Sequence, residues 1–479
     1  MEALSGLTIE EQRVLICRLY HIYRQMSLRC ESFDKFYEWG RIIISDFNDI
    51  DLALTAEEKI FSRLNDYSRL EKDFGNGGPV MKEFVNFSQT LSGLYREFTI
   101  DCLNRGKGYY GLALRTLVNS FPDHSVKSWK RIVLAGFNAL TRAEQLFFEQ
   151  LNDLEQTSIY WDIDEYYYND PLQEAGFFFR NNPLVTPPKN TTWITADLLT
   201  EKKIDIIGVP GRIAQAKAAG ESLGREKHLW DDTAVILPDE SLLFPLLHSL
   251  PESLKHINVT MGYPLKNTSL FHLISSIFEL YSGELSEEGS HFHFQNVEHL
   301  LLHPYILPID REEINRFLDN CYQVNRSIIT TTDMERLDPA IKALFTPGHT
   351  VFSLLADLNS LLKIILAMFA DREESSVEIE YIYQFYTLFQ QLEELLREYD
   401  IELGRDTFWK LLRDIIEEAT IPFLGEPLQG LQVMGLLESR TLDFKNVYIL
   451  SLNEGIVPAP RSAHSFIPAE IRSAFNLPT

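Results

Sequence analysis

The sequence lacks the short motifs that mark ATP-driven enzymes and many hydrolases. No GxxxxGK(S/T) stretch occurs, so the chain offers no loop of glycine amides and lysine to hold the phosphates of ATP. No GxSxG and no HExxH stretch occurs either, which excludes the nucleophile elbow of α/β-hydrolases and the zinc site of common metalloproteases. The sequence therefore predicts no catalytic residue and no cofactor in this chain.

Cysteine is scarce, and the cysteines stand far apart. None belongs to a CxxC pair, which argues against a zinc ribbon or an iron–sulfur cluster. Acidic residues stand among the first apolar ones, so we expect no secretory signal at the start of the sequence. Isolated cysteines suit a reducing compartment, and we expect a cytoplasmic protein. The cysteines are Cys17, Cys30, Cys102 and Cys321.

Long uninterrupted apolar runs are also missing. The most apolar stretch, 351–370, contains Asp357, Asn359 and Lys363. Charged side chains are costly at the centre of a bilayer, so we expect a core helix here and no membrane partner.

Histidines gather between 291 and 303, where His299 and His303 would share one helix face at i, i+4. No cysteine or placed carboxylate completes a ligand set. We therefore expect ordinary surface histidines and no metal site.

Positive charge is in short supply. The chain has 44 Lys and Arg against 69 Asp and Glu, which gives a formal net charge of -25 at pH 7. The molecule as a whole therefore repels a polyanion. Any contact with nucleic acid must use a local basic patch in a cleft.

The pattern that is present is α/β, interrupted by two helical blocks. Apolar residues recur at helical spacing in 1–130 and again in 284–428. Between and after these blocks, short apolar strands alternate with amphipathic helices, which is typical of parallel sheets. We expect a strand–helix–strand unit over 131–164, with Asp162 and Asp164 as loop or cap residues. We also expect one sheet that contains strands 203–208, 233–237, 256–260 and 446–450, and a further strand at 431–434.

The amino-acid sequences of three stretches carry a more specific signal than this pattern of strands and helices. They are 33–51, 231–265 and 432–458, the last of which contains GLLESRTLDFKNVYILSLNEGIVP. The last stretch resembles the motif V region of superfamily I DNA helicases. More closely, all three resemble AddB-type subunits of bacterial helicase–nuclease complexes, whose relatives carry a PD-(D/E)XK nuclease.

The resemblance implies a RecA-like, P-loop NTPase-like core with two large helical insertions. It divides the chain into five parts: 1–130, a helical 1B-like domain; 131–202, the remainder of a 1A-like α/β domain; 203–283, the first part of a 2A-like domain; 284–428, a helical 2B-like insertion; and 429–479, the return to the 2A-like domain.

The departures from that family argue against a motor. Arg440–Phe444 stands where a working helicase has Lys-Gly-Leu-Glu-Phe-like residues, and Leu437 occupies the place of the usual histidine. Leu134–Phe137 lacks the Asp-Glu pair that would hold Mg²⁺. Motif VI and the nuclease domain are not found in these 479 residues.

Three groups of residues are candidates for contact with nucleic acid. One is a loop with Arg440, Thr441 and Lys445. In the helicase fold the corresponding segments line the path of one strand, so the resemblance implies that Arg440 contacts a phosphate. The second group is a helix, and the third is the basic stretch 104–131, whose interleaved aromatic residues suit stacking on bases. The helix offers Arg212, Gln215 and Lys217, and the basic stretch offers Arg105 and Lys107 beside Tyr109, Tyr110 and Trp129.

Three functions stay open at this point. The first is a helicase-like, ATPase-inactive scaffold of a double-strand-break repair nuclease, which binds single-stranded DNA or DNA ends and pairs with an AddA-like helicase subunit. The second is part of an active superfamily I helicase whose Walker A segment lies outside this chain. The third is an acidic helical module that contacts other proteins only.

Overall fold

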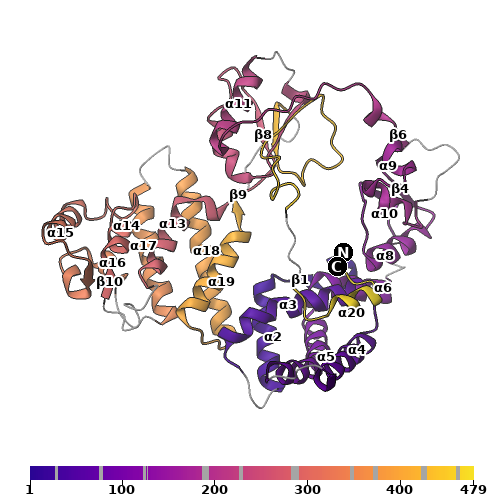
Figure 1. Cartoon of the computed structure of the whole chain (residues 1–479), viewed down its shortest axis with the longest axis horizontal. Helices are drawn as coiled ribbons and strands as arrows, with labels where there is room; N and C mark the ends of the chain where they lie inside the picture. The colour runs from indigo at the N-terminus through magenta and orange to yellow at the C-terminus, as the bar shows by residue number, and fades with distance from the viewer. Residues whose placement is uncertain are drawn as a thin grey trace. The chain divides into compact units, whose positions relative to one another are not determined.

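The computed structural model describes residues 1–478 except 27–30, 75–78, 122–125, 127, 186–193, 226–229, 282–290, 346–349, 370–375, 422–428 and 460–463. For the rest of 67–89 it describes the backbone alone. The protein is mixed α/β, mostly helical, with small parallel sheets. By its internal contacts the chain divides into two compact units. Figure 1 labels their helices and strands. Unit 1 is Met1–Gly208, Arg440–Asp443 and Pro460–Thr479, and unit 2 is Val209–Ser439 and Phe444–Ala459.

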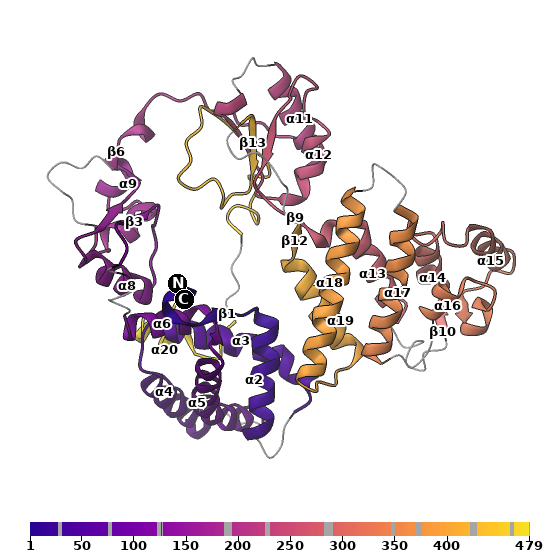
Figure 2. The same ribbon diagram turned by 180° about the vertical axis from the view of Figure 1, so that it is seen from behind.

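Unit 1 is built on a helical bundle, as the sequence predicts. In helix α3 (Phe33–Leu52), one face carries large apolar side chains that are almost fully buried, among them Phe36, Ile43 and Phe47. This spacing is what forces the segment to be a helix with one face in the core. Figure 2 shows the same bundle from behind. Its helices are α1 (Glu2–Ser5), α2 (Gln12–Met26), α3 (Phe33–Leu52), α4 (Glu57–Phe74), α5 (Pro79–Arg105) and α6 (Tyr110–Asn119), joined by α20 (Ala469–Ala474).

The α/β part of unit 1 confirms the predicted strand–helix–strand unit. Strands β3 (Ile132–Ala135) and β4 (Thr157–Tyr160) pair in parallel, and α8 (Arg142–Asn152) connects them. Helix α8 begins at a capping box formed by Thr141 and Glu144. Asp164 caps the next helix by accepting from Tyr166 N at 2.9 Å, so its predicted role as a cap is confirmed. The remaining elements are β5 (Ile163–Asp164), α9 (Glu165–Asn169), α10 (Phe177–Arg180) and β6 (Ile194–Thr195), with β5 and β6 parallel.

Unit 2 contains a four-stranded sheet whose strands are all parallel, in the order β14-β7-β13-β8. The two central strands are buried along their whole length, as parallel strands covered on both faces are. Two strands that follow one another in sequence, β13 and β14, are not neighbours, because β7 lies between them. The strands are β7 (Thr233–Ile236), β8 (Ile257–Val259), β13 (Leu431–Met434) and β14 (Asn446–Ile449), accompanied by α11 (Arg212–Arg225) and α12 (Leu243–Leu247).

The prediction that residues 203–208 form a strand of this sheet is wrong. Residues 203–208 form no strand, and their isoleucines are exposed: 76% for Ile204, 95% for Ile206 and 68% for Ile207. The other three predicted strands, 233–237, 256–260 and 446–450, do share one sheet, which also contains β13. A short apolar run becomes a strand only where another strand offers its backbone groups, and the sequence of the run alone does not reveal that partner.

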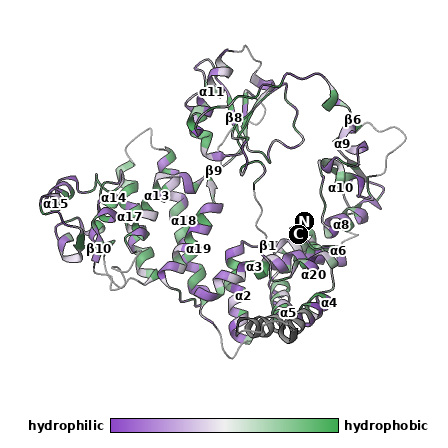
Figure 3. Cartoon of the chain, viewed as in Figure 1, coloured by the Kyte–Doolittle hydropathy of each residue, from purple (hydrophilic) through white to green (hydrophobic). Residues whose placement is uncertain are grey.

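A helical insert interrupts unit 2 after β8. Strands β9 (Tyr263–Pro264) and β12 (Thr420–Ile421) pair antiparallel where the chain enters and leaves the insert. Both views show α17, α18 and α19 side by side, and hydrophilic and hydrophobic residues alternate along them (Figure 3). A short antiparallel pair, β10 (His291–His293) with β11 (Ile328–Thr330), was not expected. The helices are α13 (Ser269–Glu279), α14 (Phe294–Leu301), α15 (Arg311–Gln323), α16 (Pro339–Ala343), α17 (Val351–Phe369), α18 (Ser376–Glu398) and α19 (Arg405–Glu418).

Helix α17 is the one helix in the described part of the chain that is long and apolar enough to cross a membrane. It packs along α18 and buries one face, including Leu355, Leu358 and Ile365.

Candidate nucleic-acid interface

Three members of the basic stretch of unit 1 are already paired with acidic residues or buried. Arg105, at the end of α5, pairs with Asp101 at 3.0 Å, and Lys107 pairs with Glu10 at 3.3 Å. Lys107 lies in strand β2 (Lys107–Gly108), which pairs in parallel with β1 (Thr8–Ile9). Tyr109 is 3% exposed, so it cannot stack on a base. Tyr110, Trp129, Lys130 and Arg131 of the same stretch are exposed, and Lys127 lies outside the described residues. The contact of 104–131 with nucleic acid therefore stays a prediction, in which Tyr109 can take no part.

Arg115, another member of that stretch, belongs to a buried polar network. Its Nε lies 2.7 Å from Oδ1 of Asp51, a residue with no exposed surface. Tyr109 donates to Asp51 Oδ2 at 2.6 Å, and Tyr95 donates to Asp51 Oδ1. Burial raises the pKa of Asp51, although Arg115 and the two tyrosines oppose that rise. The basic residue thus serves the core of the bundle, which spacing along the sequence could not reveal.

In unit 2 the structure brings Arg212 and Gln215 to the carboxyl edge of the parallel sheet. Arg212 begins α11, and its Nη2 donates to Asp239 and, at 2.5 Å, to Ser241 Oγ in the turn that follows β7. Gln215 Oε1 accepts from the backbone N–H of Ser451, two residues after β14, at 2.8 Å. In open α/β sheets this edge is where ligands bind.

Asp239 is the anchor of this arrangement. Burial acts to raise its pKa, but the bonds from Ser241 and Arg212 outweigh burial and leave the pKa below its usual value. Asp239 Oδ1 accepts from Ser241 Oγ at 2.7 Å and from Ser241 N at 3.2 Å. The carboxylate is therefore ionised at neutral pH and offsets the charge of Arg212.

Lys445, by contrast, lies at the opposite edge of the same sheet. Its backbone N–H donates to Asp232 O at 3.0 Å, and its ammonium pairs with the Asp232 side chain at 2.5 Å. Asp232 precedes β7 and Asp239 follows it, so the length of the strand, roughly 13 Å, separates the two ion pairs. Lys445 and Arg212 thus do not belong to one patch.

Two of the predicted cations remain available for contact with a phosphate. Arg440 and Lys217 are both exposed, and no described residue forms an ion pair with either of them. Arg440 lies in the exposed tip 440–443 of the loop between β13 and β14. Its neighbour Thr441 has φ +58, a left-handed conformation that is uncommon for a β-branched residue, and donates from Oγ1 to the carbonyl of Arg440 at 2.7 Å.

Acidic residues accompany the cations at the carboxyl edge. Glu240 follows Asp239, and burial and the nearby charge of Glu438 raise its pKa, which Lys266 lowers. A carboxylate pair of this kind weakens the attraction for a polyanion. The edge is therefore suited to one or two specific phosphate contacts and not to general binding of nucleic acid.

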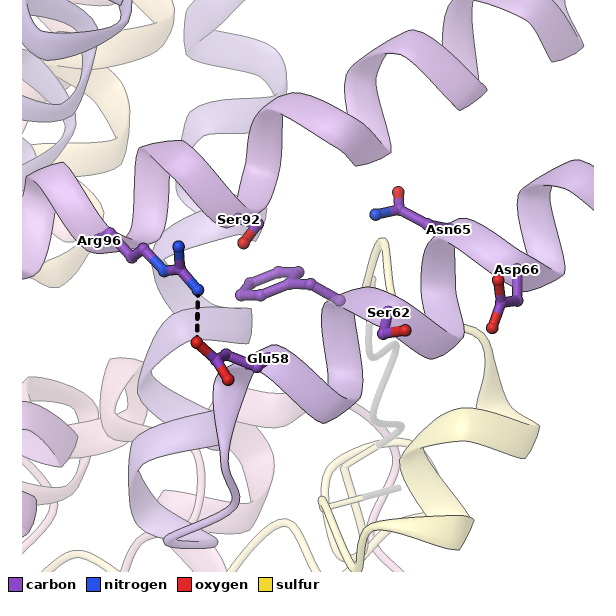
Figure 4. A pocket seen from close by; sticks show the side chains of 7 residues that line it. Glu58, Ser62, Asn65, Asp66, Ser92 and Arg96 are labelled. Atoms are coloured by element: carbon purple, nitrogen blue, oxygen red, sulfur yellow. Dashed lines mark hydrogen bonds and ion pairs between the residues drawn. The ribbon is translucent and has the colours of Figure 1, made fainter.

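A pocket on unit 1 offers no competing chemistry. It is lined by residues of α4 and α5, two of which, Arg96 and Glu58, form an ion pair at 2.8 Å (Figure 4). It contains neither a histidine nor a cysteine, and the lining residues are Glu58, Phe61, Ser62, Asn65, Asp66, Ser92 and Arg96.

The histidine cluster differs from its prediction at one residue. Helix α14 ends at Leu301, so His303 does not share its face with His299; it is 8% exposed, and its Nδ1 accepts from Tyr305 N at 3.3 Å. The pKa of His303 is lowered to about 4, mainly by burial; a bond with the Ser269 backbone opposes this shift, and the nearby His299 and His272 add to it. Within the described ranges, no three potential ligands gather into a metal site.

We expect this histidine to make unit 2 sensitive to acid. The unfolded chain binds a proton near pH 6.5 and the folded protein only near pH 4, so stability rises with pH across that window. Acidification from pH 7 to pH 4 should cost unit 2 on the order of 2 kcal/mol, measured as amide hydrogen exchange in α13 and α14. The variant His303→Phe should lose this slope, and His248→Phe, at an exposed site of unit 2, should keep it.

No protein-family model matches the chain, and a search of curated proteins finds no match.

Proposed function

We propose that the chain is a helicase-like, ATPase-inactive DNA-binding scaffold of the AddB type. In this proposal unit 2 is a RecA-like domain that carries a helical insert, and the partners are single-stranded DNA or DNA ends and an AddA-like helicase subunit in the cytoplasm. Three features support this proposal: the parallel sheet, the insert between β9 and β12, and the amino-acid sequence of 432–458. The observation that carries it is the exposed Arg440, which forms no ion pair with a described residue and lies in the loop that joins two strands of that sheet.

The salt dependence of binding tests this function. Fluorescence anisotropy of a labelled single-stranded oligonucleotide is measured across a salt series. It gives the affinity and the salt slope, which is the slope of the logarithm of the binding constant against the logarithm of the salt concentration. Arg440→Ala should weaken binding and reduce the slope by roughly 0.7, because one phosphate contact is lost. The matched control is Arg413→Ala on α19, whose side chain is 47% exposed and pairs with Glu417. It should leave both unchanged.

Two outcomes would contradict the proposal. If the wild type binds and Arg440→Ala keeps affinity and slope, Arg440 contacts no phosphate. If the wild type shows no binding even at low salt, the scaffold function is wrong.

A second function, an acidic module that contacts proteins, is favoured by one observation. Four of the six predicted cations already have acidic partners, and the net charge is -25. The absence of DNA binding would leave this function as the better one.

A further inference from the structure

We propose that Asp239 and Ser241 are positioning residues that preset Arg212 for contact with a phosphate of single-stranded DNA at the carboxyl edge of the unit 2 sheet. The inference rests on the proposed function and adds a second contact to that of Arg440. It assigns a role to two side chains in the turn after β7 that their sequence does not suggest.

The geometry fixes one end of the guanidinium and leaves the other end free. Nη2 of Arg212 carries both bonds, one to Asp239 and one to Ser241 Oγ. No described residue bonds to Nε or Nη1, and 62% of the side chain is exposed. A phosphate oxygen can therefore approach Nη1 without breaking the existing bonds.

The two anchors are themselves held in place. Asp239 is only 13% exposed, and it accepts from both the backbone and the side chain of Ser241. Helix α11 is fixed against the end of β14 by the bond between Gln215 and Ser451 N. An arginine with a fixed rotamer loses less side-chain entropy when it binds, which strengthens its contact with a phosphate.

The variant Asp239→Asn separates positioning from mere capping of the turn. Asparagine caps a helix start as well as aspartate does, so the turn should persist, but the charged partner of Arg212 is gone. If Asp239 positions Arg212, single-stranded DNA should bind about three- to tenfold more weakly. The salt slope should stay unchanged, because Arg212 keeps its charge.

Three further variants complete the test. Arg212→Ala should weaken binding and reduce the slope by roughly 0.7, since a cation is removed. Ser241→Ala should weaken binding as Asp239→Asn does. Ser241→Thr retains the hydroxyl and should restore the wild-type affinity.

The outcomes are distinct. Tighter binding by Asp239→Asn would mean that the carboxylate competes with phosphate for Arg212, and unchanged binding would mean that it has no role; either result overturns this inference and leaves the proposed function standing. Absence of DNA binding by the wild type overturns both. A parallel titration with ATP tests whether Arg212 binds a free nucleotide and not a DNA strand. Saturable binding of ATP that is lost in Arg212→Ala would assign the contact to a nucleotide and overturn the inference.

Discussion

The substitution Arg115→Met should lower the free energy of unfolding of unit 1 by about 3–5 kcal/mol, because it leaves the buried carboxylate of Asp51 without its cation. Arg115 also donates from Nη2 to the carbonyls of Ile50 and Thr55, each at 2.7 Å, and those acceptors would lose a donor as well. Amide hydrogen exchange in α3 and α6 measures this loss within unit 1.

The pH dependence of the variant identifies the cause. Without Arg115, the pKa of Asp51, already raised by burial, rises further in the folded protein. In the folded variant Asp51 therefore becomes protonated at a higher pH than in the wild type. The loss of unfolding free energy relative to the wild type should be largest near pH 7 and should shrink as the pH falls. The control is Arg96→Met, whose exposed ion pair with Glu58 should contribute less than about 1 kcal/mol. A deficit that is equal at pH 5 and pH 7 would point to lost packing and not to the unpaired charge.

The substitution Arg472→Met should release the C-terminal segment of unit 1. Arg472 is 7% exposed, and it pairs with Asp46 at 3.0 Å and with Asp49 at 2.5 Å on α3. Asp46 also accepts from Ser465 Oγ at 2.6 Å and Phe466 N at 2.8 Å, so one carboxylate ties two parts of the segment to the helix. Loss of the arginine leaves Asp46 buried and unpaired, at a cost of about 3–5 kcal/mol.

Limited proteolysis within 464–478 measures this release, and Arg142→Met, which removes an exposed arginine 3.8 Å from Glu149, is its control. Burial raises the pKa of Asp46 to about 6 despite its bonds to Ser465, Phe466 and Arg472. The folded protein therefore keeps a proton that the unfolded chain loses above about pH 4, and stability falls as pH rises from there to about 6. Equal cleavage of wild type and Arg472→Met would show that the ion pairs do not hold the segment.

The sequence by itself determined most of the elements. Apolar spacing is a local property. It predicted the helices of 1–130 and the strand–helix–strand unit of 131–164, and it placed the strands β7, β13 and β14 within one residue of their observed ends. The parallel arrangement also followed, because helices between short apolar strands leave few alternatives. The missing phosphate-binding motif is likewise a property of the sequence alone.

Tertiary structure alone decided which residues meet. Lys445 and Asp232 are 213 positions apart, and Arg115 is 64 positions from Asp51, so nothing local indicates that either cation is already paired. The same holds for the placement of Lys445 and Arg212 at opposite edges of one sheet, for the burial of His303, and for the exposed isoleucines of 203–208. Periodicity fixes which face of an element is apolar, but the partner of each charge and each strand edge depends on contacts between distant segments, and those contacts form only when the chain is folded.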